Sequence, residues 1–364
     1  MSLGCENHTA YIYDRGGMSR LFQIEPLTSI QWERLRDDIS HATVHVVNPG
    51  PDCQEKMTKV HPNRMELVIF RGKDRVWEGP ISRMAWHRDR IEIEAKDVMH
   101  YAYRTIMRSA YKNGYPNITT TIQRAINILG GELIRKESLD PPINVLPHII
   151  AYTTDGDSQT SKNTVPYQST VFDDIDAMAW RAGLDYTVLG RSILLFDTHT
   201  AWFTTPTVTE ADFLSEIIIT QYGMEHATYA AVTSAEGVYG TTPDVVDPFY
   251  GEWEILDNAY DEDGTTQPTV DALTSQAVRN LDGRNPVPMH VRVPDGSQLN
   301  PNGTLKMEHL IPGVRIPLRA TLLTLEVAQL QKLDRVVVTE NGDDGEKIAV
   351  TLSPASKNDE PPEE

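Results

Sequence analysis

The sequence predicts an α+β fold, mainly β, that is divided into several domains. Its 364 residues are enough for two to four domains, and the 40% share of hydrophobic residues is ordinary for a chain that buries a sizeable core. Three short segments between residues 66 and 97 alternate apolar and polar positions and are separated by turn residues, which is typical of an antiparallel meander. Apolar residues at helical spacing predict amphipathic helices over 117–129, 170–182 and 269–281.

The meander is defined by its two turns. Residues 71–74 form the first turn, because they include a glycine, which adopts angles that other residues resist, and an aspartate, which bonds its own backbone. Residues 87–90 form the second turn, and the strict alternation over 91–95 predicts a half-buried strand after it. A helix is expected over 97–110, because the carboxylate of Asp97 can accept hydrogen bonds from the free amides of a first turn.

The chain before the meander adds further strands. Residues 1–19 are expected to form a loose arm, and strands are expected over 20–24, 29–34 and 42–47. Two prolines and a glycine within 48–52 predict a firm turn. With the meander this makes about six strands, enough to close a small barrel or sandwich.

The middle of the chain predicts two helices and a hairpin. The helix over 117–129 is expected to end at the glycine pair that follows it. Residues 136–168 are rich in Pro, Asp, Ser and Thr, and they predict a long loop that is either functional or mobile. Thr170 and Asp173 match a capping box at the start of the next helix, and residues 184–196 predict a tight hairpin after it.

Toward the C-terminus the strand signals return. Residues 213–235 predict another pair of strands, and residues 310–318 predict a turn followed by a strand. Two further strands, over 333–339 and 347–352, flank the hairpin signal at 341–344, which contains an Asn-Gly pair.

These elements divide the chain into four parts. An N-terminal β-barrel-like domain with a closing helix is expected over 1–108, and a middle α/β domain over 109–212. A β-rich domain containing the helix 269–281 is expected over 213–355. The acidic tail, 356–364, is too polar and too rich in proline to fold alone.

Several of these segments resemble one family when they are read in chain order. They are the Trp-Glu-Gly-Pro hairpin with the Ala-Lys-Asp helix start within 76–97, the helix and hairpin of 170–196, and the Pro-Gly step at 312–313. The Trp-containing strand at 29–34, which precedes an Asp-containing turn, adds to them. This arrangement is similar to the minor tail proteins that form the baseplate hub of long-tailed actinobacterial phages (siphoviruses), and the resemblance covers roughly residues 20–354.

The resemblance implies a multi-domain tail hub with two small tube-like β-barrel domains, near the two ends of the chain, and inserted α/β domains. A homotrimer would then place six barrels in a ring, so that a three-fold hub can mate with a six-fold tail tube. The implied function is structural: a minor tail protein of the virion that closes or continues the DNA channel at the tail tip. The implied partners are other tail proteins, namely the distal tail ring, the tape measure and further tail-tip proteins, with indirect contact to the host cell surface. The implied site of synthesis is the cytoplasm of the bacterial host.

The charge and hydropathy of the chain limit which partners are expected. The chain has 33 Lys and Arg against 52 Asp and Glu, a formal net charge of −19, which argues against affinity for nucleic-acid phosphates. Genomic DNA is therefore expected to pass without specific binding, since an acidic wall repels it. No apolar run approaches the roughly 20 residues of a membrane span, so no membrane insertion is expected, and the first residues do not match a secretory signal. Cys5 and Cys53 are expected to be free thiols.

No catalytic, cofactor-binding or metal-binding residue is assigned from the sequence, and no cofactor is expected. The acidic segment that contains Asp257, Asp261 and Asp263 is expected to be a solvated turn, with a loose calcium site as the alternative. The histidines best placed to be ligands are each expected to be surface or hydrogen-bonded residues: His41, His45, His87 and His100.

Two other functions remain open. A tail-associated cell-wall hydrolase is supported by the abundance of carboxylates and by the loop 136–168, and opposed by the absence of any catalytic motif. A tail-tip receptor- or glycan-binding protein would be favoured by exposed aromatic residues near loops. Core packing is the expected role of most of the six tryptophans, and Trp77, Trp86, Trp180 and Trp253 do not cluster in the sequence.

Overall fold

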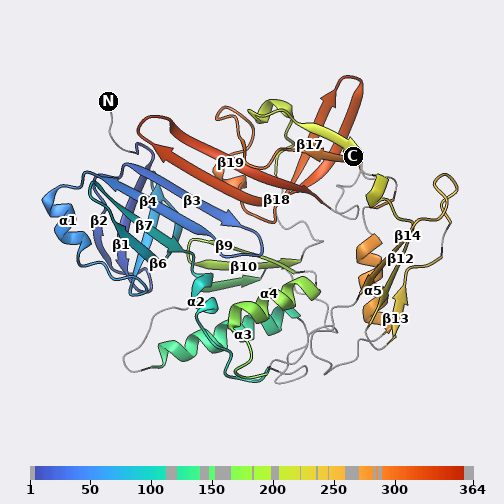
Figure 1. Ribbon diagram of the computed structural model, residues 1–364, viewed down its shortest axis with the longest axis horizontal. Helices are drawn as coiled ribbons and strands as arrows, with labels where there is room; N and C mark the ends of the chain where they lie inside the picture. Colours follow the sequence, from blue (N-terminus) through green and yellow to red (C-terminus); the bar gives the residue numbers. More distant parts are fainter. Residues whose placement is uncertain are drawn as a thin grey trace.

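The structure, a computed structural model, has a mainly β fold with helices between its sheets, as the sequence predicts (Figure 1). A large sheet combines strands from both ends of the chain, and an α/β region and a smaller unit of three strands and one helix lie beside it. The structure describes residues 5–111, 121–139, 147–151, 165–182, 184–197, 205–221, 223–234, 237–244, 246–258, 270–281, 284–285 and 289–355.

The large sheet has eleven strands in the order β16-β19-β18-β3-β4-β7-β6-β5-β1-β2, with β17 paired to β18. Its N-terminal strands are β1 (His8–Asp14), β2 (Arg20–Gln23), β3 (Ser29–Leu35), β4 (His41–Val47), β5 (Met65–Arg71), β6 (Asp74–Trp86) and β7 (Arg90–Lys96). Its C-terminal strands are β16 (Ser297–Gln298), β17 (Arg315–Leu322), β18 (Leu325–Asn341) and β19 (Gly345–Pro354). The two sets join where β3 and β18 pair antiparallel over seven residue pairs.

The meander forms as predicted. Strands β5, β6 and β7 follow one another in antiparallel pairs, with Gly72 at a φ of +59° in the first turn. In the second turn the His87 amide donates to the Arg90 carbonyl over 2.9 Å. Ile91, Ile93 and Ala95 of β7 are buried, which confirms the half-buried strand expected there.

The expectation of a loose arm over residues 1–19 is wrong. Strand β1 pairs with β5 over seven residue pairs and with β2 on its other edge. Its own alternation explains the strand, since His8, Ala10 and Ile12 are buried while the residues between them are more exposed. The histidine at an inward position obscures this pattern, because its ring counts as polar until its buried partners are known.

Two helices near this sheet also differ from the prediction. Helix α1 (Pro51–Met57) begins within the turn expected at 48–52 and was not predicted. Helix α2 (Met99–Tyr103) is much shorter than the helix expected over 97–110. Asp97 caps it as expected, accepting the Met99 amide over 2.9 Å. The chain then leaves the helix because residues 105–107 form backbone hydrogen bonds with residues 167–171.

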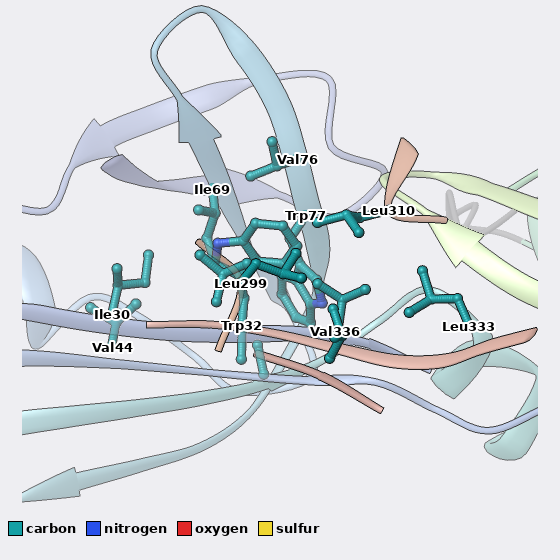
Figure 2. Close-up of a cluster of buried hydrophobic side chains, with 14 of the residues drawn as sticks. Ile30, Trp32, Val44, Ile69, Val76, Trp77, Leu299, Leu310, Leu333 and Val336 are labelled. Atoms are coloured by element: carbon teal, nitrogen blue, oxygen red, sulfur yellow. The ribbon is translucent and has the colours of Figure 1, made fainter. Parts of the chain in front are cut away.

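One apolar core underlies both halves of the large sheet (Figure 2). Trp32 of β3 and Trp77 of β6 lie at its centre, and Leu299, Leu333 and Val336 from the C-terminal region pack against the same cluster. Trp32 and Trp77 are buried, which confirms core packing for these two rings. The two ends of the chain therefore share a core as well as a sheet.

The middle region has its own core, which is separate from that of the large sheet. Its helices are α3 (Thr121–Glu137) and α4 (Val171–Ala182), and its sheet has the strand order β8-β10-β9 with β8 (His148–Ala151), β9 (Leu184–Leu189) and β10 (Ser192–Asp197). The capping box at α4 is confirmed: the Thr170 amide donates to Asp173, and the Asp173 amide donates to Thr170 Oγ1, each over 3.2 Å. The hairpin expected over 184–196 is present, with Gly190 at a φ of +56° in its turn.

Helix α3 does not end at Gly130–Gly131 as expected. It continues to Glu137 because the next turn is held by packing: Glu132 and Leu133 are buried. Gly131 lets the helix approach Tyr111, whose hydroxyl would lie 2.5 Å from a Cβ at this position. The long loop expected over 136–168 is also wrong in part, since it contains the last residues of α3 and all of β8. Residues 140–146 and 152–164 of that loop lie outside the described residues.

The smaller unit contains β12 (Tyr229–Thr233), β13 (Tyr239–Thr241), β14 (Glu254–Asn258) and α5 (Val270–Leu281), which confirms the helix expected over 269–281. The two strands expected within 213–235 exist but are not partners. Strand β11 (Ile218–Gln221) pairs with β15 (Met289–Arg292), whereas β12 pairs with β13 and β14. Short 3-10 helices complete the chain: Glu210–Asp212, Gly223–Glu225 and Met307–His309. The hairpin signal at 341–344 joins β18 to β19 as expected, and the acidic tail 356–364 lies outside the described residues.

Gly79 is required where β6 passes from its pairing with β5 to its pairing with β7. A Cβ at this position would lie 1.8 Å from the Lys96 carbonyl oxygen and 2.7 Å from the Asp97 Cα. Both neighbours are backbone atoms, so they cannot rotate away. We expect Gly79→Ala to lower the free energy of unfolding by about 3 kcal/mol, at the upper end of overpacking in a core.

The matched control is Gly50→Ala, because Gly50 has a φ of −64° and no atom within 4 Å of a Cβ. We expect that control to change stability by less than about 1 kcal/mol. Scanning calorimetry of both variants tests this, and equal melting temperatures for the two would contradict the close approach at Gly79.

Candidate functional site

The clearest concentration of charge lies where the three main parts of the chain meet. We define this charged junction as Arg36, Asp37, Asp185, Lys332 and Asp334. Arg36 Nη1 lies 3.2 Å from Asp185 Oδ1, and Arg36 Nη2 lies 2.7 Å from Asp334 Oδ1. Lys332 Nζ contacts the other oxygen of Asp185 over 2.8 Å. The junction therefore links the N-terminal strands, the middle region and β18 through side chains.

Local structure fixes these side chains in place. Asp37 follows the end of β3 at a φ of +57°, a conformation that Asp tolerates better than most residues. Its amide donates to the Tyr186 carbonyl, and its carboxylate accepts the Tyr186 amide over 2.8 Å. Asp334 lies at the irregularity in the β18–β19 register, between Leu333 and Arg335. The backbone thus aims three carboxylates at one arginine and one lysine.

The junction holds three carboxylates against two cations, so it favours one extra proton. Burial, and then the negative charge of Asp185, raise the pKa of Asp37 to about 8. Burial alone would lower the pKa of Arg36, but the surrounding carboxylates of Asp185, Asp334 and Asp37 raise it. Asp37 is therefore the carboxyl group in the junction whose pKa is raised.

A second ionic cluster joins the meander to the middle region. Arg191, in the turn between β9 and β10, lies 2.9 Å from Glu66 Oε2 and 3.7 Å from Glu78 Oε1. Arg75 pairs with Glu78, and the Tyr101 hydroxyl donates to Glu66. Both glutamates are buried, so these partners offset the cost of removing their charge from water.

A third buried cluster joins the first strand to β18. His8 Nδ1 lies 2.6 Å from Glu340 Oε2, and Trp32 Nε1 donates to His8 Nε2 over 3.1 Å. Because Nε2 accepts, Nδ1 carries the proton that points at Glu340. Burial would raise the pKa of Glu340, but hydrogen bonds from the Asn7 amide and from His8 lower it. Sequence reasoning missed this pair, because no local pattern relates residues at opposite ends of the chain.

The four histidines considered from the sequence have different surroundings. His41 and His45 both lie on β4. His41 Nδ1 lies 3.0 Å from Glu33 Oε1, and His45 Nδ1 lies 3.9 Å from Glu92 Oε2. His87 is exposed in the second turn of the meander. His100 is buried in α2 and stacks on Tyr103.

The acidic segment expected to be a turn begins as a strand. Asp257 lies on β14, and its Oδ2 accepts a hydrogen bond from Asn280 of α5 over 2.8 Å. Asp261 and Asp263 lie outside the described residues. Across the described residues, no three side chains of His, Cys, Asp or Glu converge in a way that could hold a metal ion.

Cys5 and Cys53 are free thiols, as predicted. Burial, followed by the charge of Glu340, raises the pKa of Cys5 to about 12. In the described part of the chain, no helix has the length and apolar character needed to cross a bilayer.

An exposed aromatic loop stands out on the smaller unit. We define the aromatic loop as residues 246–253. Asp247 organises it by accepting the amides of Phe249 and Tyr250, each over 2.8 Å. The Trp253 indole donates to the Tyr250 carbonyl over 2.9 Å. The Phe249 side chain is 84% exposed, so the loop presents a large apolar ring to solvent on a hydrogen-bonded frame.

His226 packs against the aromatic loop. Its ring centroid lies 4.4 Å from that of Tyr250, and its Nε2 lies 3.4 Å from the Asn285 side-chain oxygen. The Asn285 amide in turn donates to Asp247 over 3.1 Å. Trp253 is 56% exposed and Trp86 is 50% exposed, so these two rings are not part of a core. The side chain of Trp180 lies outside the described part of the structure.

Comparison with solved structures shows that this chain has the fold of phage tail proteins. It is similar to the 43 kDa tail protein of prophage MuSo2 from Shewanella oneidensis, at 12% identity and a TM-score of 0.61, over 98% of this chain and 100% of that one. It is similar to a tail protein from Neisseria meningitidis, at 10% identity and a TM-score of 0.60, over 95% and 96% of the two chains. It is also similar to the E. coli c3393 protein, a type VI secretion component described as resembling the T4 tail proteins gp27 and gp5, at 11% identity and a TM-score of 0.50, over 91% and 74%.

Similarity is confined to the fold. No protein family model matches the sequence, and no curated protein sequence matches it. Identities of 10–12% mean that the likeness carries over the arrangement of strands and helices but no individual residue.

The charged junction predicts a pH dependence of stability. The folded-state pKa of Asp37 lies above its ordinary value of 3.8, so the folded protein binds the extra proton between these two values. Stability from this group is therefore greatest at low pH and declines as the pH rises through about 8. We expect Asp37→Asn, which copies the protonated side chain, to reduce the fall in melting temperature between pH 5 and pH 8.5, a window that covers most of this range.

The control is Asp14→Asn, because the pKa of Asp14 is lowered rather than raised. Thermal melts of the three proteins across this range provide the measurement. A wild-type protein and an Asp37→Asn variant with parallel pH profiles would show that Asp37 is ionised throughout.

Proposed function

We propose that this chain is a structural component of a phage virion, a minor tail protein that forms the baseplate hub at the tip of the tail tube. The observation that carries the proposal is the large sheet, in which strands from both ends of the chain share one core while the middle regions are inserted between them. Similarity to a prophage tail protein over nearly the whole of both chains supports it.

The two ends of the chain would supply the two tube-like β-barrel domains. The N-terminal set, β1–β7, and the C-terminal set, β16–β19, are joined within the sheet by the pairing of β3 with β18. Three copies would place six such domains around a channel in a closed ring, in which each contact is repeated by symmetry. The expected domain limits, 1–108, 109–212 and 213–355, remain part of this proposal.

The charge of the chain suits a channel for DNA. A formal net charge of −19 lets the surface repel a polyanion, so genomic DNA can pass without binding. The partners in this proposal are neighbouring tail proteins: the distal tail ring, the tape measure and further tail-tip proteins. The protein would be located at the tail tip of the virion after synthesis in the cytoplasm of the host, and its role is assembly rather than catalysis.

Native mass spectrometry over a range of protein concentrations tests the proposed ring. We expect a trimer to accumulate as the concentration rises, because the strand edges of each copy become paired across subunits. A filter assay at low salt should show no more duplex DNA retained than by an unrelated acidic protein. A chain that remains monomeric at the highest concentration, or that binds duplex DNA tightly, contradicts the hub.

Glycan recognition is a second candidate function, and the aromatic loop favours it. An exposed ring on a rigid frame can stack on a sugar, and it loses little conformational freedom when it does so. Such a loop at a tail tip would contact the surface of the host cell. The loop could serve this purpose in a structural hub, so the two functions are compatible.

We expect Phe249→Ala to weaken retention on immobilised bacterial cell-wall glycan by about ten-fold or more. Burying a phenylalanine ring contributes about 1.5–3 kcal/mol, and about 1.4 kcal/mol corresponds to ten-fold in affinity. The matched control is Trp86→Ala, which removes an exposed ring from a different surface. Equal retention of the two variants, or no retention of the wild-type protein, rejects glycan binding by this loop.

A further inference from the structure

A cavity of about 370 Å³ opens between the meander, α2 and the end of α3. Figure 1 shows α2 lying between the large sheet and α3. The volume falls in the range of about 300–1,000 Å³ that is usual for ligand pockets. We define the basic pocket by the residues that line it: Arg15, Asn63, Pro80, His100, Tyr101, Arg104, Thr105, Ile106, Arg108, Arg135, Lys136 and Leu139.

The charge of this lining is opposite to that of the chain. Five of the lining residues are Arg or Lys, and none is Asp or Glu. The chain as a whole has 52 acidic residues against 33 basic ones, so a concentration of cations without lining carboxylates is unexpected. Cations so close together repel one another, and the repulsion grows as water is excluded.

Helix geometry accounts for only part of this cluster. Arg135 and Lys136 lie in the last turn of α3, where basic residues are stabilised by the helix dipole. Arg15 comes from the β1–β2 turn, and Arg104 and Arg108 come from the segment after α2. Three elements thus bring their cations to one place without a local reason to do so.

The nearby carboxylates are already occupied. Glu132 accepts the amides of Arg108 and Ser109 and contacts Arg135 Nε over 3.3 Å. Glu66 is bonded to Arg191 and Tyr101 in the second ionic cluster. Among the described residues, the guanidinium groups of Arg104 and Arg108 contact no carboxylate.

The electrostatics of Lys136 agree with this geometry. Burial, and then the positive charges of Arg135, Arg104, Arg15 and Arg108, lower the pKa of Lys136 to about 8. A bound anion would reverse that shift, because it stabilises the protonated amine. The pocket is therefore a place where a negative group would relieve repulsion that the protein itself does not neutralise.

The pocket also has an apolar rim. Ile106 is 52% exposed and Leu139 is 45% exposed, and both line the cavity. A free phosphate ion would contact only the cations. The backbone of duplex DNA is convex and cannot enter a cavity of this volume. A short peptide with both carboxylate and apolar side chains fits the two kinds of lining.

We propose that the basic pocket binds an acidic peptide segment of a partner polypeptide. The carboxylates of the segment contact Arg104, Arg108 and Lys136, and an apolar side chain beside them packs on Ile106 and Leu139. The acidic character of the rest of the surface keeps such a segment from binding elsewhere, which gives the pocket its selectivity. This inference depends on the cavity alone and does not require the hub function.

Fluorescence anisotropy with a labelled peptide of alternating Asp, Glu and Leu tests the proposal on the full chain. We expect Arg104→Gln with Arg108→Gln to weaken binding at least ten-fold, and rising NaCl to weaken it further. The matched control is Arg88→Gln with Arg319→Gln, which removes two exposed arginines that do not line the cavity and should leave binding unchanged. Neither double variant should melt below the wild-type protein, because the altered guanidinium groups contact no carboxylate among the described residues.

Three comparisons separate the alternatives. A peptide in which Asn and Gln replace the acids should not bind, and Ile106→Gln should weaken binding of the acidic peptide but not of inorganic phosphate. Displacement of the peptide by phosphate at equal concentration would identify a small-anion site and overturn the proposal. Binding that is equal in the two double variants would place the peptide elsewhere, and binding of duplex DNA in preference to the peptide would also overturn it.

Discussion

The pairing of β3 with β18 is the contact on which the rest of the structure depends. It joins segments at opposite ends of the chain: Arg335 donates to Glu33, 302 residues away, beside seven backbone pairs. Closing so long a loop costs only slightly more than closing a short one, because the entropy of closure grows with the logarithm of its length. The shared apolar core then stabilises the closed arrangement, and the elements between β7 and β16 become an insertion into one sheet.

Charged contacts join the inserted middle region to the large sheet. Its core is separate from that of the large sheet, and the contacts between them include the charged junction, the Glu66–Glu78 cluster and the backbone hydrogen bond from Asp37 to Tyr186. Burying charges costs free energy that their pairing only partly offsets, so such contacts contribute little net stability. Their geometric demands are strict, however, because a small rotation would leave a buried charge unpaired. We infer that these clusters fix the orientation of the middle region on the sheet.

The elements that sequence reasoning predicted are those determined by their own residues. The meander, the capping box at Thr170 and the hairpin at Gly190 depend on alternation, caps and turns within a few positions. The wrong predictions concern elements whose existence or limits depend on residues far away in the chain. Strand β1 depends on β5, α2 is cut short by residues 167–171, and α3 continues past Gly131 because Tyr111 packs on it. The charged junction was not predictable for the same reason, since no spacing relates Arg36, Asp185 and Lys332.

Net charge illustrates the same limit at the scale of the whole protein. A value of −19 describes the average surface, and it sets the long-range repulsion of polyanions. It says nothing about where cations gather, because the five that line the basic pocket come from three separate elements. Screening confines the effect of such a cluster to about 8–10 Å at physiological salt, so the pocket and the acidic surface act at different distances. An acidic chain can therefore repel nucleic acid at long range and still present a local site for carboxylates.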